Sequence, residues 1–208
     1  MNCTAFSAQQ TCVMFIVCLW LAGCTESVYQ RMNDPARDEW QNPQLVVAKL
    51  AIAPSSRVAD LGAGGGYFAG YLAKAVGPEG TVYAVDINDT ALDIISKEMK
   101  LRGITNVLPI RAEPNDAKLP EPVDFVFSSN TYHHMKDRTA YFKSLTRYLK
   151  PNGRVAIVDF HPNGFFSGKL GHGTAKEDVR REMESAGYRL TADYDVIDRQ
   201  HFQIFIRE

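Results

Sequence analysis

Acidic and glycine residues combine in the stretch VADLGAGGGYFAG, which joins an apolar run to a helical pattern. Asp60 is followed by Gly62, Gly64 and Gly66 in the spacing D-x-G-x-G-x-G. Glycines let a backbone turn sharply and approach a ligand closely, and a helix that begins there offers unpaired N–H groups. The stretch therefore predicts a loop that holds a cofactor.

A second carboxylate follows the next apolar run, TVYAVDI. Asp86 lies 24 residues after Gly62 (86 minus 62), at the predicted end of a strand. A carboxylate at this place accepts hydrogen bonds from ribose hydroxyls in dinucleotide-binding folds. The alternative is a turn or helix-capping role, for which Asp89 is better placed. We therefore assign Asp86 to the ribose of the cofactor.

Histidines gather in the segments SSNTYHHM and DFHPNGFFSGKLGHG, each after a predicted strand. Histidine titrates near neutrality, with an unperturbed pKa of about 6.5, so one of them could take a proton from a reacting group. The predicted base is His134 or His133, with Tyr132 as a substrate or cofactor contact. The two segments also contain Asp159, His161 and His172.

A metal site is the alternative use of these histidines. Neighbouring side chains of an extended segment point in opposite directions, which would separate His133 from His134. No acidic residue stands in an E/D-x-H spacing with either His133 or His134. We therefore predict no metal.

Strand and helix patterns alternate from Arg57 onward, which predicts a parallel sheet with helices on both faces. The last two strand patterns are joined by a link that only a hairpin fits, so the final strand should be antiparallel. The predicted fold is α/β, with a Rossmann-like, seven-stranded, mostly parallel sheet. Its strands are expected at 57–62, 81–87, 106–113, 123–130, 154–160, 188–198 and 201–208.

Four helices are expected between these strands. One runs from Gly66 to Val76, and another is capped by Asp89. A third is capped by Asp137 and ends at Pro151. The fourth opens with a capping box over Thr174–Glu177, in which a hydroxyl and a carboxylate would pair with the first backbone N–H groups.

The glycine spacing separates two classes of cofactor. The dinucleotide fingerprint G-x-G-x-x-G requires a small residue where this chain has Tyr67. The spacing found here, together with Asp86 and the terminal hairpin, resembles the class I S-adenosylmethionine (SAM)-dependent methyltransferases. The resemblance covers about Gln41 to Glu208 and is nearest to the ubiquinone/menaquinone C-methyltransferase-like branch. It implies SAM as the cofactor.

The resemblance also implies cofactor contacts. Glu113, before Pro114, is expected near the adenine, although Asp116 competes for this position. Asp60 is expected beside the methionine part of SAM or in ordering the glycine loop. Asn130, at the end of the fourth strand, is predicted as a further contact with the cofactor.

The predicted function is methyl transfer from SAM to a small-molecule acceptor. The alternatives are a non-catalytic lipoprotein of the same fold that binds a ligand or partner, and a dinucleotide oxidoreductase, which Tyr67 disfavours. A net charge of -1 without a basic block argues against a nucleic-acid partner. The glycine-rich loop at 161–173, with Phe165 and Phe166, predicts a lid over the substrate.

The first 23 residues contain no Lys, Arg, Asp or Glu, and their apolar run ends in the lipobox-like sequence LAGC. This pattern predicts a signal peptide at 1–23, with Cys24 lipidated and anchoring the chain at the cell envelope. A linker at 24–40 and the methyltransferase domain at 41–208 would follow. The alternative is translation from Met32, which would give a cytoplasmic protein.

Overall fold

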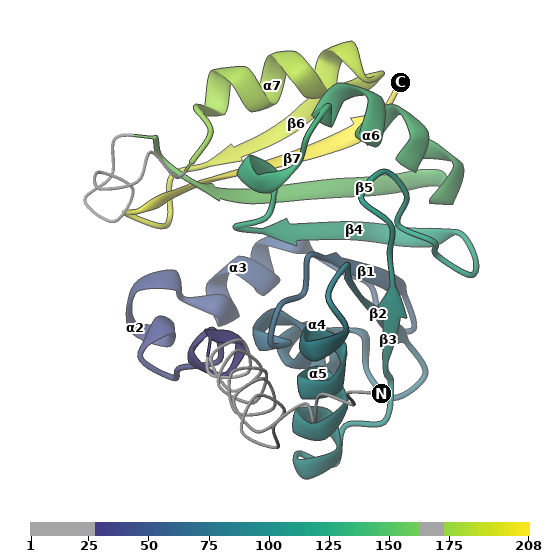
Figure 1. Cartoon of the computed structure of the whole chain (residues 1–208). Helices are drawn as coiled ribbons and strands as arrows, with labels where there is room; N and C mark the ends of the chain where they lie inside the picture. The colour runs from purple at the N-terminus through teal and green to yellow at the C-terminus, as the bar shows by residue number, and fades with distance from the viewer. Residues whose placement is uncertain (1–27, 163–172) are drawn as a thin grey trace, which may run out of the picture.

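The computed structural model describes residues 28–162 and 173–208, so the predicted signal peptide, Cys24 and most of the predicted lid lie outside it. Seven strands form one sheet in the order β3-β2-β1-β4-β5-β7-β6 (Figure 1). The first five pair in parallel, whereas β7 is antiparallel to both of its neighbours. The predicted topology is confirmed. The strands are β1 (Arg57–Leu61), β2 (Thr81–Asp86), β3 (Val107–Arg111), β4 (Val123–Ser129), β5 (Leu149–Phe160), β6 (Tyr188–Tyr194) and β7 (Gln200–Arg207).

Helices cover both faces of this sheet. Buried side chains of α3, α4 and α5 join one apolar cluster, and those of α6 and α7 join the other. The bounds are α2 (Arg37–Gln41), α3 (Pro43–Leu50), α4 (Tyr67–Val76), α5 (Asp89–Leu101), α6 (Arg138–Leu145) and α7 (Lys176–Ser185), with 3₁₀ turns η1 (Tyr132–His134) and η2 (Thr146–Tyr148).

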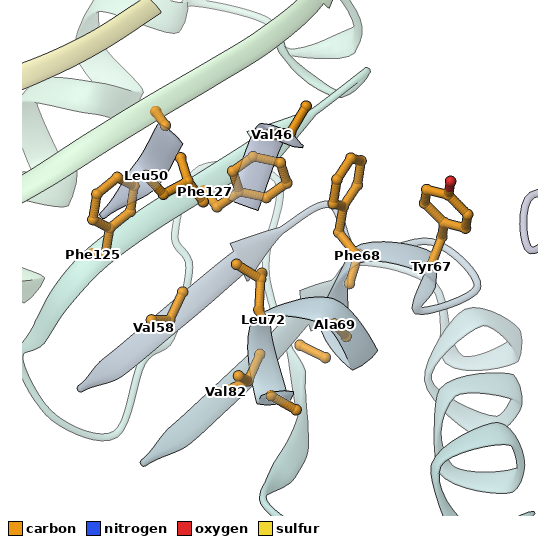
Figure 2. Close-up of a cluster of buried hydrophobic side chains, with 14 of the residues drawn as sticks. Val46, Leu50, Val58, Tyr67, Phe68, Ala69, Leu72, Val82, Phe125 and Phe127 are labelled. Carbon is orange, nitrogen blue, oxygen red and sulfur yellow. The ribbon is translucent and has the colours of Figure 1, made fainter. Parts of the chain in front are cut away.

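The two clusters follow from the alternation of side chains along each strand. Figure 2 shows one of them, in which Val58 and Phe127 of neighbouring strands meet Leu72 of α4 and Val46 of α3. Their neighbours Ala59 and Val126 point to the opposite face. Each fully buried Val, Leu or Phe side chain contributes about 1.5–3 kcal/mol, so this layer fixes the strand ends that carry polar residues.

The start of α5 differs from the prediction by one residue. Asn88 is the N-cap, and its side chain accepts the backbone N–H of Thr90 at 2.9 Å. Asp89 is therefore the first residue of the helix and not its cap. The cause is Asp86, whose side chain accepts the N–H of Asn88 and fixes the turn there.

The other helix boundaries are partly as predicted. Asp137 caps α6, since its side chain accepts the N–H of Ala140. That helix ends at Leu145 and not at Pro151, because β5 already begins at Leu149. The capping box at Thr174–Glu177 is wrong: the N-cap of α7 is Ala175, which has no side-chain oxygen, and Thr174 lies before it.

Residues 28–40, predicted as linker, contain helical turns at 28–31 and from Arg37. No helix within 28–162 and 173–208 is long and apolar enough to cross a bilayer.

Candidate functional site

A cavity of about 950 Å³ opens at the carboxyl ends of β1, β2 and β4, where parallel sheets bind their ligands. Its wall is formed by the loop between β1 and α4 (residues 62–66, the glycine loop), by the ends of these strands, by η1 and by residues 28–41 (the N-terminal segment). The predicted site residues that line it are Asp60, Gly62, Gly64, Asp86, Glu113, Asn130, His133 and His134.

Three glycines of the D-x-G-x-G-x-G stretch have a left-handed backbone, and two of them, Gly62 and Gly64, line the cavity, whereas Gly66 does not. Gly62, Gly64 and Gly66 have φ angles of 74°, 56° and 86°, in the left-handed region that favours glycine. At Gly62 an added Cβ would also lie 2.1 Å from Oγ1 of Thr131. The D-x-G-x-G-x-G spacing therefore reports a backbone that only glycine adopts without strain.

Gly65 has a different requirement. A Cβ there would lie 2.4 Å from the carbonyl oxygen of Tyr29 and 2.7 Å from Oδ1 of Asn33. The Asn33 side chain donates to the Gly65 carbonyl at 2.6 Å. This glycine therefore makes room for the N-terminal segment.

The side chain of Asp86 holds the glycine loop in place through hydrogen bonds to backbone N–H groups. Its two carboxylate oxygens accept the N–H groups of Gly64 and Asn88, each at 2.9 Å. Burial raises the pKa of this carboxyl, and these backbone hydrogen bonds act in the opposite direction. The predicted ribose carboxylate lies in the cavity wall and also orders the loop.

Asp60 is 2% exposed, and its Oδ2 has no hydrogen-bond partner among the described residues. Burial raises its pKa to about 7, and the charge of Asp86 adds to this, while Arg37 acts in the opposite direction. A buried carboxyl with an unpaired oxygen at a cavity wall favours a cationic ligand, because a positive charge would stabilise its ionised form.

The N-terminal segment contributes Arg37, which sequence reasoning missed because residues 24–40 were predicted as linker. Its guanidinium carbon lies 3.9 Å from the centre of the Tyr67 ring. The hydroxyls of Tyr67 and Tyr71 donate to Asp38 at 2.5 and 2.8 Å. These contacts bring Arg37, Trp40, Tyr29 and Met32 into the cavity wall.

Glu113 lines the cavity and forms an ion pair with Lys118 at 3.1 Å. Its competitor Asp116 does not line the cavity and is bound by Arg147 and Tyr148. The geometry therefore favours Glu113 as the residue beside a ligand.

His133 pairs with a buried carboxylate. Its Nδ1 lies 2.6 Å from Oδ1 of Asp159, whose side chain is fully buried. Because η1 is helical and not extended, the His133 and His134 rings lie 4.0 Å apart at the cavity wall, which corrects the expectation that they diverge. Within 28–162 and 173–208, no group of three or more His, Cys, Asp and Glu is arranged to hold a metal ion.

Tyr132 lies away from the cavity. It is fully buried, stacks on Phe142, and its hydroxyl donates to Glu182 at 2.7 Å. Arg138 holds the same carboxylate through two hydrogen bonds. In this structure the predicted substrate contact is a core residue that ties η1 to α7.

Two of the remaining histidines, His161 and His201, are described by the structure. His201, opposite Asp159 on β7, donates from Nε2 to the Thr174 carbonyl at 2.9 Å. Burial lowers its pKa, so His201 is neutral there. His161 packs against the His201 ring, and His172 lies outside the described residues.

Residues 58–153 match a protein family described as a methyltransferase domain. The chain is 30% identical over 109 residues to the ubiquinone/menaquinone biosynthesis C-methyltransferase of Vibrio campbellii, covering 51% of this chain and 42% of that protein. It is 29% identical over 136 residues to the demethylmenaquinone methyltransferase of Geobacillus kaustophilus, covering 63% and 57%. The chain thus spans about half the length of these curated relatives.

The fold is also similar to solved structures. A SAM-dependent methyltransferase from Aquifex aeolicus superposes with a TM-score of 0.82 at 27% identity, over 88% of this chain and 98% of that one. An O-methyltransferase-like protein from Nostoc punctiforme gives a TM-score of 0.70 at 16% identity, which shows the fold alone.

Proposed function

We propose that this chain, a member of the class I SAM-dependent methyltransferases with SAM as its cofactor, transfers a methyl group to a small-molecule acceptor. One observation carries the proposal: the same cavity is lined by the glycine loop, by the carboxylates of Asp60 and Asp86, and by His133, which pairs with the buried Asp159 behind it. A methyl donor and a proton acceptor would therefore face one another within a single chamber.

The cofactor fits the residues at one end of the cavity. SAM carries an ammonium and a sulfonium, and the unpaired Oδ2 of Asp60 offers a negative charge to a cation. Asp86 lies at the end of β2, where a carboxylate accepts ribose hydroxyls, and Glu113 lies farther along the wall. The glycine loop lets the backbone come close to the ligand.

The bound cofactor supplies a methyl group on a positively charged sulfur. Holding an acceptor in line with that group can lower the barrier by about 7–11 kcal/mol. Transfer would break the sulfur–methyl bond as the acceptor–methyl bond forms, leaving a neutral thioether. If the acceptor atom carries a proton, His133 would take it.

Asp159 equips His133 to take this proton. A hydrogen bond from Nδ1–H to the carboxylate fixes the tautomer, which leaves the lone pair on Nε2. Once protonated, His133 would form an ion pair with this fully buried carboxylate. This pair therefore stabilises the product of proton transfer, and His133 is preferred to His134 as the base.

The acceptor end of the cavity is aromatic. Trp40 and Phe160 stack with ring centres 5.9 Å apart, and both line the cavity. Tyr141 and Met135 add further apolar surface. A flat, partly aromatic acceptor fits this wall, and the names of the curated relatives, which refer to quinone biosynthesis, support an acceptor of that kind.

Calorimetric titration of the full chain with SAM, and with NAD as the control, tests the cofactor. Binding of SAM and not of NAD is expected, and absence of heat with SAM would sink the proposal. A panel of aromatic hydroxyl and amine compounds is then assayed for methylated products by mass spectrometry. SAM binding without any product would instead favour a non-catalytic role.

We also propose that the chain is a lipoprotein of the cell envelope, anchored through Cys24. The support is the uncharged, apolar N-terminal sequence that ends in LAGC.

A further inference from the structure

A buried relay of polar side chains joins the N-terminal segment to the end of β4. Arg37 donates from Nε and Nη2 to Oε1 of Gln41, at 3.1 and 2.6 Å. Gln41 then donates from Nε2 to Oε1 of Gln200 at 3.0 Å, and Gln200 donates from Nε2 to Oδ1 of Asn130. Both glutamines are fully buried.

The guanidinium sets the direction of every amide in this relay. An arginine only donates hydrogen bonds, so the Gln41 atom that faces Arg37 must be the oxygen. The Gln41 nitrogen therefore faces Gln200, which must present its own oxygen, and the Gln200 nitrogen then requires the oxygen of Asn130. Amide orientations are often ambiguous, but a charged donor at one end removes that ambiguity here.

The last amide of the relay lies in the cavity wall. Asn130 lines the cavity, and its backbone is held by a 2.9 Å hydrogen bond from its N–H to the Val158 carbonyl. Its φ angle of 56° is one that Asn tolerates better than most side chains. With Oδ1 committed to Gln200, the polar atom left over is Nδ2, which has no hydrogen-bond partner among the described residues.

We propose that Asn130 Nδ2 is a preset hydrogen-bond donor for an oxygen of the bound ligand, with Gln41 and Gln200 as the positioning residues that orient it. This inference rests on the proposed function and adds what the site recognises: a carboxylate, carbonyl or oxyanion oxygen at the wall between the glycine loop and His133. Such an oxygen occurs in the methionine carboxylate of SAM and in a carbonyl-bearing acceptor.

Asn130→Asp is the direct test. Aspartate has the same shape, tolerates the same backbone conformation and still accepts from Gln200, but it presents an oxygen where Asn130 presents a donor. Loss of one hydrogen bond should weaken the binding of the ligand that Asn130 contacts by about tenfold or more. Asn42→Asp is the matched control, because Asn42 also has a left-handed backbone, with φ 43°, and lies outside the cavity wall.

Three ligands are titrated by calorimetry: SAM, decarboxylated SAM, and a hydroxynaphthoquinone as a flat carbonyl probe in the presence of S-adenosylhomocysteine. If Asn130 Nδ2 binds the cofactor carboxylate, Asn130→Asp lowers the affinity for SAM and leaves the affinity for decarboxylated SAM unchanged. If Nδ2 binds the acceptor, only the affinity for the naphthoquinone falls. Unchanged affinity for SAM and the naphthoquinone, in a folded variant of a protein that binds both, overturns the inference.

Gln200→Glu tests the positioning role. An ionised glutamate cannot donate, so Asn130 should rotate to present Nδ2 to it and turn Oδ1 toward the cavity. Gln200→Glu should then lower the affinity for the same ligand as Asn130→Asp does, and by the same factor. The affinity of the double variant should be no lower than that of either single variant. Additive losses would show that Gln200 does not act through Asn130. Gln200→Met, which adds no buried charge, serves if Gln200→Glu does not fold, and partial loss is expected because it leaves the amide unoriented.

Failure of the proposed function is distinguishable from failure of this inference. The former is absence of SAM binding in the parent chain, and the latter is an Asn130→Asp variant that binds every ligand as its parent does.

Discussion

The Nδ1 atom of His133 lies 2.6 Å from Oδ1 of Asp159, which connects the turn after β4 to the last residues of β5. The carboxylate is fully buried, while His133 lines the cavity. A carboxylate in the core therefore holds the ring of a histidine that lies in the cavity wall. The base predicted from the sequence is His134 first and His133 second, and the contact with Asp159 favours His133.

His133→Gln should lower turnover by about 10²–10⁴-fold, the range expected when a positioned base is lost. Its affinity for SAM should stay within about twofold of the parent value. His134→Gln is the matched control and should cost much less. Turnover on the acceptor found by the panel, with SAM binding measured alongside, checks this. An equal loss in both variants would remove the assignment of His133.

Asp159→Asn should lower turnover in the same direction as His133→Gln. An amide carries no negative charge, so it cannot form an ion pair with the imidazole that has taken the proton from the acceptor. Turnover on the acceptor found by the panel, with SAM binding measured alongside, checks this. Turnover equal to that of the parent chain would indicate a merely structural carboxylate.

SAM affinity should fall as the pH is lowered through about 7. Burial raises the pKa of Asp60 to about 7, so its ionised fraction decreases roughly tenfold per pH unit below that value. A cationic ligand binds the ionised form, and binding below pH 7 must release a proton. The same shift means that the unliganded fold loses stability as the pH rises from about 4 toward 7.

The measurement is SAM titration between pH 5 and 9 in two buffers with different ionisation enthalpies, which reports the protons released. Asp60→Asn should bind SAM more weakly and lose the dependence on pH. A parent chain whose affinity is flat across this range would contradict the role given to Asp60.

Asp86→Ala should weaken SAM binding by more than tenfold, because it removes both the proposed ribose acceptor and the partner of the Gly64 N–H. Turnover at saturating SAM should change less. Asp89→Ala is the control, since that side chain is 79% exposed in the first turn of α5, three residues further along the chain. Comparable losses in both variants would refute the assignment of Asp86.

Gly65→Ala should displace the N-terminal segment without straining the glycine loop. The added Cβ would collide with the Tyr29 carbonyl, whereas φ at Gly65 is outside the left-handed region. The sequence has two tryptophans, so in a Trp20→Phe background the fluorescence of Trp40 reports the segment. A red shift in Gly65→Ala is expected, and an unchanged spectrum would mean that the segment adapts in place.

Cys24 should incorporate a labelled fatty acid when the full chain is expressed in a bacterium that processes lipoproteins. Cys24→Ala should abolish the label and release the chain from the membrane fraction. Absence of label in the parent chain, with the N-terminus at Met32 by mass spectrometry, would support the internal start.

The sheet was predictable because its signal is local and repeated. Runs such as RVADL and TVYAVD bury both faces, and the glycine spacing fixes the loop between β1 and α4. The carboxyl ends of these strands then meet at one edge, so Asp60 and Asp86 could be placed together.

The rest depended on contacts that the sequence does not display. Successive residues in a 3₁₀ turn are about a third of a turn apart, so Tyr132 turns into the core while His133 and His134 reach the wall. Arg37 and Trp40 lie on a short helix without a strong periodic pattern, and their packing on Tyr67 and Phe160 places them in the cavity wall. The orientation of the Gln200 side-chain amide, that is, which way its oxygen and its nitrogen point, follows from the Arg37 guanidinium, which is far away in the sequence.

Gly65 shows that adjacent glycines in this loop answer to different constraints. Protein engineers who transplant the domain without its first 41 residues would retain every glycine that the cofactor requires and would free Gly65 to vary. Among natural relatives, the residue at this position should accordingly co-vary with the presence of an N-terminal cover rather than with cofactor use.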